Sequence, residues 1–227
     1  MTYKKDSRGE MVKRIQKALA SAGLKVIADG IFGAITEEAV REFQRMRGLK
    51  IDGIVGPATL SKLGVAVVQQ HTGLKKVKRD IRDIIIHCSA TPEFRDYTVT
   101  DIRQMHLLRG FSDIGYHYVV YRDGSVHEGR NVEVIGAHTS GYNAHSIGVC
   151  YIGGVETDGK TPKDTRTQEQ KTALLSLLRD LRRLYPKARI QGHRDYSPDL
   201  NGNGTVEPWE WIKYCPCFYA GKEYKDC

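Results

Sequence analysis

Two rows of apolar residues near the start of the chain follow the spacing of helices that bury one face. They are Val12, Ile15 and Leu19 in the first row, and Ala39, Val40, Phe43 and Met46 in the second. A third short helix is expected to begin at Pro57, because proline suits the first helical turn. The pattern predicts a small all-α domain of three helices around one core.

The rest of the chain alternates between β-branched runs and helical patterns, which is typical of an α/β domain. Strands are predicted over residues 83–90, 115–121, 146–154 and 189–195. One helix is expected from Thr100 to Gly110, and a longer one follows Thr167 and Gln170, which occupy capping-box positions. Leucines line one face of the longer helix at Leu174, Leu177, Leu178, Leu181 and Leu184. These elements predict an α/β (α+β) domain with a central mixed β-sheet flanked by helices.

A short internal repeat marks the N-terminal part of the chain. Ala-Asp-Gly-Ile-Phe-Gly-Ala-Ile-Thr at residues 28–36 returns 23 positions later as Ile-Asp-Gly-Ile-Val-Gly-Pro-Ala-Thr at residues 51–59. Each copy holds an Asp-Gly turn, where glycine tolerates a positive φ, and then a second glycine before a helix start. The repeat therefore supports the prediction of short helices joined by turns.

Length and composition bound the class of protein. A chain of 227 residues fits a small domain plus a medium one, and 40% hydrophobic with 27% charged residues is ordinary for a globular protein. The N-terminus has no signal-peptide core, and no run of about 18 apolar residues occurs. We therefore expect synthesis in the cytoplasm without a signal peptide, and no transmembrane segment. Five cysteines without regular spacing argue against a disulfide framework and favour a metal role for one or two.

The net charge of +8 is concentrated at the N-terminal end. Residues 1–70 hold 12 Lys and Arg against 7 Asp and Glu, and residues 71–80 hold 4 against 1, whereas residues 81–227 hold 19 of each. A basic arm on a neutral body suits an anionic surface such as nucleic acid, an acidic membrane or the cell wall. We predict a first domain over 1–66, a solvated basic linker over 67–80 and a second domain over 81–227.

Three side chains of the second domain suggest a metal site. A hydrolytic zinc site needs three protein ligands and an open position for water, and strand ends hold ligands rigidly. His87 and His193 each end a predicted strand, and Cys215 lies two residues from Lys213, whose charge favours a thiolate. On spacing alone, a structural core histidine stays the alternative for both histidines, and Cys217 competes with Cys215.

A set of turn glycines, acidic residues and core positions spans residues 8–64. The set comprises Gln16, Leu19, Gly23, Asp29, Gly30, Phe32, Gly33, Thr36, Ala39, Val40, Phe43, Gln44, Gly48, Leu49, Asp52, Gly53, Val55, Gly56, Pro57 and Thr59. In these residues the chain resembles the peptidoglycan-binding domain found at the ends of many wall hydrolases. The resemblance implies peptidoglycan as the partner of the first domain, and no nucleic acid is expected.

Eight blocks occur in order within residues 81–218, among them Ile-Ile-Ile-His-Cys-Ser-Ala-Thr, Gly-His-Arg-Asp and Lys-Tyr-Cys-Pro. The blocks are residues 84–91, 113–118, 123–126, 129–130, 136–143, 146–150, 192–195 and 213–216. In them the chain resembles the type-2 N-acetylmuramoyl-L-alanine amidases, especially the phage-lysozyme branch, and the related peptidoglycan recognition proteins. The resemblance implies zinc on His87, His193 and Cys215. It also implies an endolysin that hydrolyses the amide bond between N-acetylmuramic acid and L-alanine and reaches the cell wall after release.

The resemblance further implies roles for side chains beside the metal. Lys213 is expected to stabilise the developing oxyanion, and Tyr116 to hydrogen-bond the attacking water, although Tyr116 can also be a buried strand tyrosine. His138 lies in a glycine-flanked loop and is expected to border the substrate groove. A non-catalytic recognition protein is the alternative function. Inactive relatives usually lack the cysteine ligand, so the presence of Cys215 favours an enzyme, which we expect to be a monomer.

An insertion at residues 199–210, relative to the short phage enzymes, follows the calcium-loop pattern of an EF-hand. Its expected Ca²⁺ ligands are Asp199, Asn201, Asn203, the Thr205 carbonyl, Glu207 and Glu210. The alternative is a polar turn before a short helix that begins at Pro208. Three carboxylates favour weak binding. Because the insertion lies between His193 and Cys215, we hypothesise that calcium orders the segment that carries the third zinc ligand.

Overall fold

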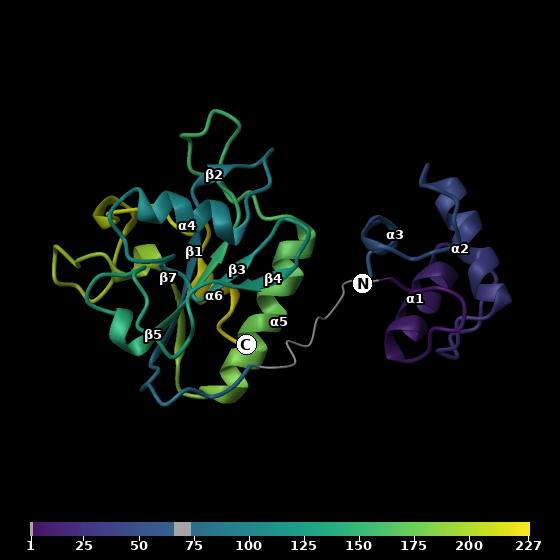
Figure 1. Ribbon diagram of the computed structural model, residues 1–227, viewed down its shortest axis with the longest axis horizontal. Coiled ribbons are helices and arrows are strands. Elements are labelled where there is room, and N and C mark those ends of the chain that lie inside the picture. Colours follow the sequence, from purple (N-terminus) through teal and green to yellow (C-terminus); the bar gives the residue numbers. More distant parts are fainter. Residues whose placement is uncertain (1, 66–73) are drawn as a thin grey trace. The chain divides into compact units, whose positions relative to one another are not determined.

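The computed structural model describes residues 2–65 and 74–227, which fall into two compact units with separate cores (Figure 1). The smaller unit holds three helices, as the apolar spacing predicts: α1 (Glu10–Ser21), α2 (Ala34–Met46) and α3 (Pro57–Leu63). Its core is formed by Val12, Ile15, Leu19, Phe32, Ala39, Val40, Phe43, Val55, Leu60 and Val65. Met46 was expected in this core but is 54% exposed, because it is the last residue of α2.

The internal repeat corresponds to two equivalent hydrogen-bond clusters, each around a buried glutamine. In the first, the Gln16 amide nitrogen donates to Asp29 Oδ1 at 2.8 Å, to the Ile31 carbonyl at 3.0 Å and to Thr36 Oγ1 at 3.0 Å. The Gln16 oxygen accepts from the Gly30 backbone N–H at 2.8 Å. The glutamine thereby fastens the Asp-Gly turn to the start of α2.

The second copy repeats these contacts around Gln44. Its amide nitrogen donates to Asp52 Oδ1 at 2.9 Å, to the Ile54 carbonyl at 2.9 Å and to Thr59 Oγ1 at 3.3 Å. Its oxygen accepts from the Gly53 backbone N–H at 2.9 Å. Buried backbone groups in a turn need such partners, so the repeated residues serve the structure of the unit.

The larger unit is built on a five-stranded mixed sheet in the order β4-β3-β5-β1-β7 (Figure 1). Four of these strands are parallel, and β4 pairs antiparallel with β3. The strands are β1 (Asp83–Cys88), β3 (Tyr118–Val120), β4 (Val126–Glu128), β5 (Ser146–Tyr151) and β7 (Arg189–Gly192). A separate pair joins β2 (Thr91–Pro92) to β6 (Gly154–Val155). The mixed sheet is confirmed, although each predicted strand is longer than the observed one.

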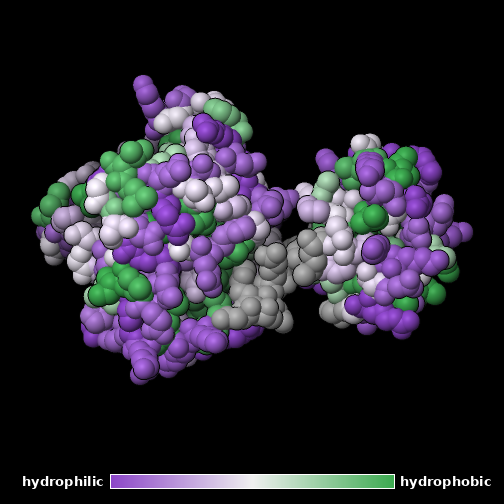
Figure 2. Space-filling model, in the orientation of Figure 1, coloured by the Kyte–Doolittle hydropathy of each residue, from purple (hydrophilic) through white to green (hydrophobic). Residues whose placement is uncertain are grey.

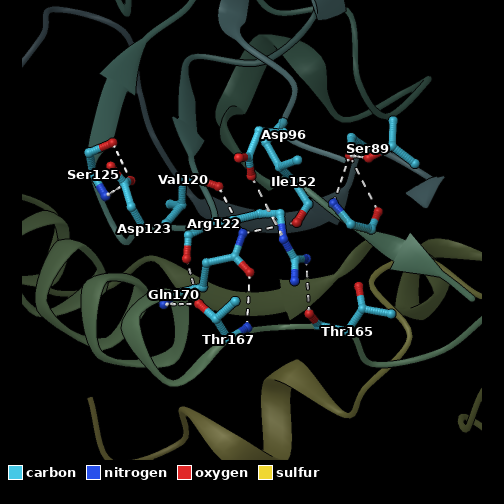
Figure 3. Close-up of polar contacts among 12 residues, drawn as sticks. Ser89, Asp96, Val120, Arg122, Asp123, Ser125, Ile152, Thr165, Thr167 and Gln170 are labelled. Atoms are coloured by element: carbon cyan, nitrogen blue, oxygen red, sulfur yellow. Dashed lines mark hydrogen bonds and ion pairs between the residues drawn. The ribbon is translucent and has the colours of Figure 1, made fainter. Parts of the chain in front are cut away.

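The long helix α5 (Gln168–Leu184) covers one face of the sheet. The predicted capping box is present, since Thr167 Oγ1 accepts from the Gln170 N–H at 3.0 Å and Gln170 Oε1 accepts from the Thr167 N–H at 3.0 Å. The Gln170 amide nitrogen also donates to the carbonyls of Val120 and Ile152 at 3.1 and 2.9 Å (Figure 3). The start of α5 is therefore pinned to the carboxyl ends of two strands, while its leucines pack on the sheet.

The opposite face carries α4 (Val99–Leu107), whose Ile102 packs with Ile114, Val119 and Ile152. The helix is capped by Thr98, which forms a capping box with Asp101. The expected start at Thr100 is therefore wrong by two residues. Short helical turns complete the unit: η1 (Asn143–His145), η2 (His193–Tyr196), η3 (Pro208–Glu210) and α6 (Ala220–Glu223).

The segment 74–80 belongs to the larger unit, whereas positions 67–73 of the predicted linker lie outside the described residues. Val77 is buried in the core under α5, and its N–H donates to the Tyr185 hydroxyl at 2.8 Å. The Arg79 guanidinium donates to the Val132 carbonyl at 3.0 Å and to the Ser146 carbonyl at 3.2 Å. Val77 and Arg79 of the basic run thus pack on the larger unit, whereas Lys75, Lys76 and Lys78 are exposed to solvent.

The surface seen in Figure 2 is mainly hydrophilic, with separate hydrophobic areas on both units. Leu200 and Trp209 of the insertion and Ile212 and Tyr214 just after it are exposed and contribute apolar surface. Within residues 2–65 and 74–227, no helix is both long and apolar enough to cross a membrane.

The glutamine clusters make a prediction about stability. Gln44→Leu should lower the free energy of unfolding of the smaller unit by about 1–3 kcal/mol, because it leaves the buried Gly53 N–H without its partner. Both tryptophans, Trp209 and Trp211, lie in the larger unit, so their fluorescence reports that unit alone. Urea titration followed by far-UV circular dichroism should show an earlier helical transition with an unchanged fluorescence transition. The exposed Gln104→Leu is the control, and an unshifted helical transition in Gln44→Leu would contradict the prediction.

Candidate metal centre

The centre begins with His87 on β1. Successive side chains of a strand point to opposite faces, so Ile84, Ile86 and Cys88 pack toward α5 while His87 projects from the other face. The partner of His87 on the neighbouring strand β5 is Cys150, which is also buried. His87 is thereby held at the carboxyl end of a central, fully buried strand.

Two further side chains join His87 from separate segments. His193 begins the turn η2 directly after β7, and its Nδ1 lies 3.1 Å from His87 Nδ1. Cys215 Sγ lies 3.8 Å from the same His87 nitrogen. The ligand atoms of the three residues all lie within 4.8 Å of one another, and no other such His, Cys, Asp and Glu group occurs among the described residues. The sequence-predicted ligands are thus brought together in space.

Both imidazoles of the centre are kept neutral by their surroundings. Burial lowers the pKa of His87 well below its ordinary value, and the neighbouring His138 and His193 lower it further. Burial and the charge of Lys213 lower the pKa of His193 to about 4. At neutral pH both rings therefore offer lone pairs, which is the form that binds a metal ion.

The backbone around Cys215 holds its thiol in place. The Cys88 N–H donates to Cys215 Sγ at 3.2 Å, and the Arg194 N–H donates to the Cys215 carbonyl at 2.9 Å. Cys217, the competing residue, instead lies with its Sγ 3.9 Å from Cys88 Sγ and 3.2 Å from the Gly154 carbonyl. The geometry places Cys215 with the two histidines and leaves Cys217 outside the group.

Tyr116 and Lys213 both lie at the centre. The Tyr116 ring is tilted against His87, with 5.0 Å between the ring centroids. Burial raises the pKa of Tyr116 well above its ordinary value, and the thiols of Cys150 and Cys215 add to this shift, so the hydroxyl keeps its proton. Lys213 is exposed, and its charge lowers the pKa of both His87 and His193. A hydroxyl donor and a cation therefore flank the three candidate ligands.

His138 is buried beside a candidate ligand. Its side chain is only 8% exposed, and its Nδ1 lies 3.1 Å from His87 Nε2. Burial lowers the pKa of His138 well below its ordinary value, with His117 and His193 contributing. His138 therefore contacts His87 on the side away from Cys215, and its place at the border of a substrate groove stays a prediction.

Arg194 is a residue of the centre that the sequence did not single out. It is 3% exposed, and its guanidinium packs against two aromatic rings inclined at 65° to each other, 4.0 Å from the centroid of Trp211 and 4.1 Å from that of Tyr219. Its Nε and one terminal nitrogen have no hydrogen-bond partner among the described residues. Stacking therefore holds the insertion against η2, beside His193. The sequence signal for this role was an arginine directly after the candidate ligand His193, together with Trp211 and Tyr219 on either side of Cys215.

The calcium-loop residues form a compact turn stabilised by backbone donors. Asp199 accepts from the N–H groups of Gly202 and Gly204, both at 2.7 Å. Glu210 is buried and accepts from the N–H groups of Leu200 and Glu207, both at 2.7 Å. The side-chain amides of Asn201 and Asn203 donate to the Glu207 carboxylate at 3.1 and 2.7 Å. Among the described residues, the three carboxylates of the loop do not gather their oxygens within 4.8 Å of one another, as the ligand atoms of His87, His193 and Cys215 do.

Two known families account for most of the chain. The fold and the centre define a class: an α/β domain with a His–His–Cys group of the kind used for hydrolysis, preceded by a separate helical domain. The N-acetylmuramoyl-L-alanine amidase family matches residues 77–210, and a putative peptidoglycan binding domain matches residues 8–63. The amidase match covers more than half of the chain, so the protein belongs to the N-acetylmuramoyl-L-alanine amidase family and carries an N-terminal peptidoglycan-binding domain.

Phage endolysins are among the similar proteins. The endolysin of Enterobacteria phage K11 is 39% identical over 132 residues, which cover 58% of this chain and 87% of that protein. The endolysin of Escherichia phage T7 is 38% identical over 130 residues, 57% of this chain and 85% of that protein. The solved N-acetylmuramoyl-L-alanine amidase LysC from Clostridium intestinale is 26% identical with a TM-score of 0.50, covering 65% of this chain and 85% of that one. These relatives support a catalytic amidase over a non-catalytic recognition protein.

The stacked arginine gives a second prediction. Arg194→Lys should lower the free energy of unfolding of the larger unit by about 1–2 kcal/mol, because a compact ammonium cannot contact the rings of both Trp211 and Tyr219 as the larger, planar guanidinium does. Urea titration followed by tryptophan fluorescence measures the change, and limited proteolysis should cut residues 197–214 faster. Arg183→Lys, on the exposed face of α5, is the matched control. Equal stability and equal cleavage in Arg194→Lys and wild type would show that the stack contributes nothing.

Proposed function

We propose that the protein is a zinc-dependent endolysin that hydrolyses the amide bond between N-acetylmuramic acid and L-alanine of peptidoglycan. Membership of the amidase family supports the reaction class. The observation that carries the zinc proposal is the group His87, His193 and Cys215, with ligand atoms within 4.8 Å of one another. Two neutral imidazoles and a thiol form a donor set that suits zinc, and three protein ligands are the number that a hydrolytic site uses.

The side chains around the proposed ligands suit amide hydrolysis. When bound, zinc supplies a Lewis acid and lowers the pKa of a coordinated water to about 7. The Lys213 ammonium would stabilise the negative charge that develops on the carbonyl oxygen. The Tyr116 hydroxyl, which keeps its proton, would donate a hydrogen bond to the same oxygen or to the attacking water.

The peptidoglycan-binding domain supports a proposal about place of action. A basic domain of this family would hold the enzyme on the anionic wall, which raises the local concentration of substrate for the catalytic unit. The phage endolysins among its relatives support action on the cell wall after release, and we propose a monomer as the working form. Peptidoglycan glycan strands and stem peptides are the proposed partners.

We also propose that the loop 199–210 binds calcium weakly. Support comes from the match of the loop to the EF-hand ligand pattern and from Glu210, a buried carboxylate at the twelfth position. In the structure the Glu207 carboxylate accepts from the amides of Asn201 and Asn203, so binding would need those amides to turn their oxygens inward. Such a rearrangement costs free energy and favours a weak site.

The zinc proposal predicts different results for two neighbouring cysteines. Cys215→Ser should lose stoichiometric zinc and lower the rate of sacculus digestion by more than the roughly 100-fold that loss of an outer-shell partner costs. Cys217→Ser should keep both, because its thiol lies outside the group. Metal analysis and mass spectrometry of the released fragments measure the two effects, with free stem peptides as the expected product.

Each outcome of this experiment has a clear meaning. Full zinc content and digestion in Cys215→Ser would overturn the ligand assignment. Loss of both in Cys217→Ser, with Cys215→Ser unaffected, would exchange the two cysteines. Release of disaccharides or of cross-linked peptide fragments, in place of intact stem peptides, would overturn the proposed bond. Sedimentation with sacculi should persist in both variants through the N-terminal domain.

The calcium proposal predicts a calcium-dependent melting temperature. Calcium at about ten times its Kd, in the millimolar range, should add roughly 1.4 kcal/mol to the stability of the larger unit. Differential scanning calorimetry of zinc-loaded protein, with and without calcium, should show this shift in wild type and lose it in Glu210→Gln. Glu38→Gln, on the exposed face of α2, is the control. A wild-type melting temperature that does not respond to calcium would disprove the site.

A further inference from the structure

The two ring nitrogens of His87 contact different groups on opposite sides of the ring. Its Nδ1 faces His193 Nδ1 at 3.1 Å and Cys215 Sγ at 3.8 Å. Its Nε2 faces His138 Nδ1 at 3.1 Å and Thr139 Oγ1 at 3.4 Å. One nitrogen is therefore directed at the candidate ligand group, and the other at a second buried side chain.

These contacts indicate positions for the ring protons. The Thr139 hydroxyl also lies 3.2 Å from His138 Nδ1, so it can donate to that nitrogen while accepting from His87 Nε2. A neutral histidine that offers Nδ1 to a metal carries its proton on Nε2. The His87 Nε2–H then donates to His138 Nδ1, which must be unprotonated to accept it. The remaining proton of His138 lies on Nε2, which is 3.4 Å from Ser146 Oγ. The chain of hydrogen bonds ends at this buried serine hydroxyl, at the start of β5.

Two glycines leave the space that the His138 ring occupies. A Cβ atom on Gly148, in β5, would lie 2.6 Å from His138 Cδ2, and a Cβ atom on Gly136 would also lie 2.6 Å from it. Contacts this short do not occur between real side-chain atoms, so glycine is required at both positions while the ring is there. Asn143 Oδ1 accepts from the N–H groups of His138 and Thr139, both at 2.9 Å, and fixes the loop that carries the ring.

We propose that His138 is a positioning residue that holds His87 in the tautomer and ring orientation needed for metal binding, and that it does not contact substrate. The inference rests on the proposed zinc site. Ligand histidines are generally oriented by an acceptor on their second nitrogen, most often a carboxylate or a backbone carbonyl. In this protein a neutral imidazole takes that place. It orients His87 without adding negative charge beside the metal.

Histidine-selective nitrogen NMR of the zinc-loaded wild-type enzyme tests the proton positions directly. The expected result is a proton on Nε2 of both His87 and His138, with Nδ1 of His138 unprotonated. A proton on His138 Nδ1 would overturn the proposal, because that nitrogen could not then accept from His87. The measurement needs no substitution at a packed position. Failure of wild type to bind zinc would instead refute the proposed function.

Two substitutions at His138 separate positioning from packing. His138→Leu fills much of this space but has no acceptor, so zinc affinity in chelator competition should fall roughly 10- to 100-fold. His138→Asn places an amide oxygen near the former Nδ1 and should restore most of the affinity. His127→Leu, at a histidine on β4 that bonds to Ser125, is the control and should leave affinity unchanged.

The remaining outcomes would overturn the proposal. If Asn and Leu weaken zinc binding equally while circular dichroism shows both folded, His138 acts through packing alone. If His138→Leu keeps wild-type zinc affinity but raises KM for sacculi, His138 is a substrate contact. The expected pattern is the reverse, with KM close to wild type and kcat restored when zinc is supplied in excess.

Discussion

The parallel pairing of β1 with β7 is the constraint on which the centre depends. The register sets Ile86 opposite Gly192, so His87 and His193 are each the next residue along the chain. Parallel strands end at the same edge of a sheet, and the two imidazoles therefore meet with 3.1 Å between their Nδ1 atoms. A shift of β1 by one residue would turn His87 toward α5 and put an isoleucine or a second cysteine in its place.

The third residue of the centre comes from outside the sheet and is held by backbone contacts. The Cys88 N–H donates to the Cys215 thiol, and the Arg194 N–H donates to the Cys215 carbonyl. Hydrogen bonds therefore hold Cys215 to both β1 and η2. Gly192 allows this approach, since a Cβ atom there would lie 2.5 Å from Pro216 Cδ. The stacked guanidinium of Arg194 holds the insertion beside it. The centre thus combines two rigid positions with one that depends on the packing of a loop.

Local signals in the sequence predicted the elements, and tertiary contacts decided the rest. The capping box at Thr167 was readable because its partner stands three residues on; the same rule applied to Thr98 and Asp101 would have corrected the start of α4. His87 and Cys215 became strong candidates only through family resemblance, because spacing says nothing about residues 128 positions apart. His138 occupies space that is free because Gly148 has no side chain. No local sequence pattern predicts this contact.

One face of the sheet packs the apolar core, and the other face carries the candidate metal centre. Toward α5, the even-numbered residues of β1 join a continuous apolar core with the helix leucines, and burial of this apolar surface stabilises the unit. On the other face, β1 and β5 carry His87 and Gly148, which bury little apolar surface but leave room for polar rings. Burying several imidazoles contributes less stability than burying apolar side chains of the same size, even when the rings are hydrogen-bonded. It is tolerated here because the opposite face of the same strands is packed with leucine, isoleucine and valine.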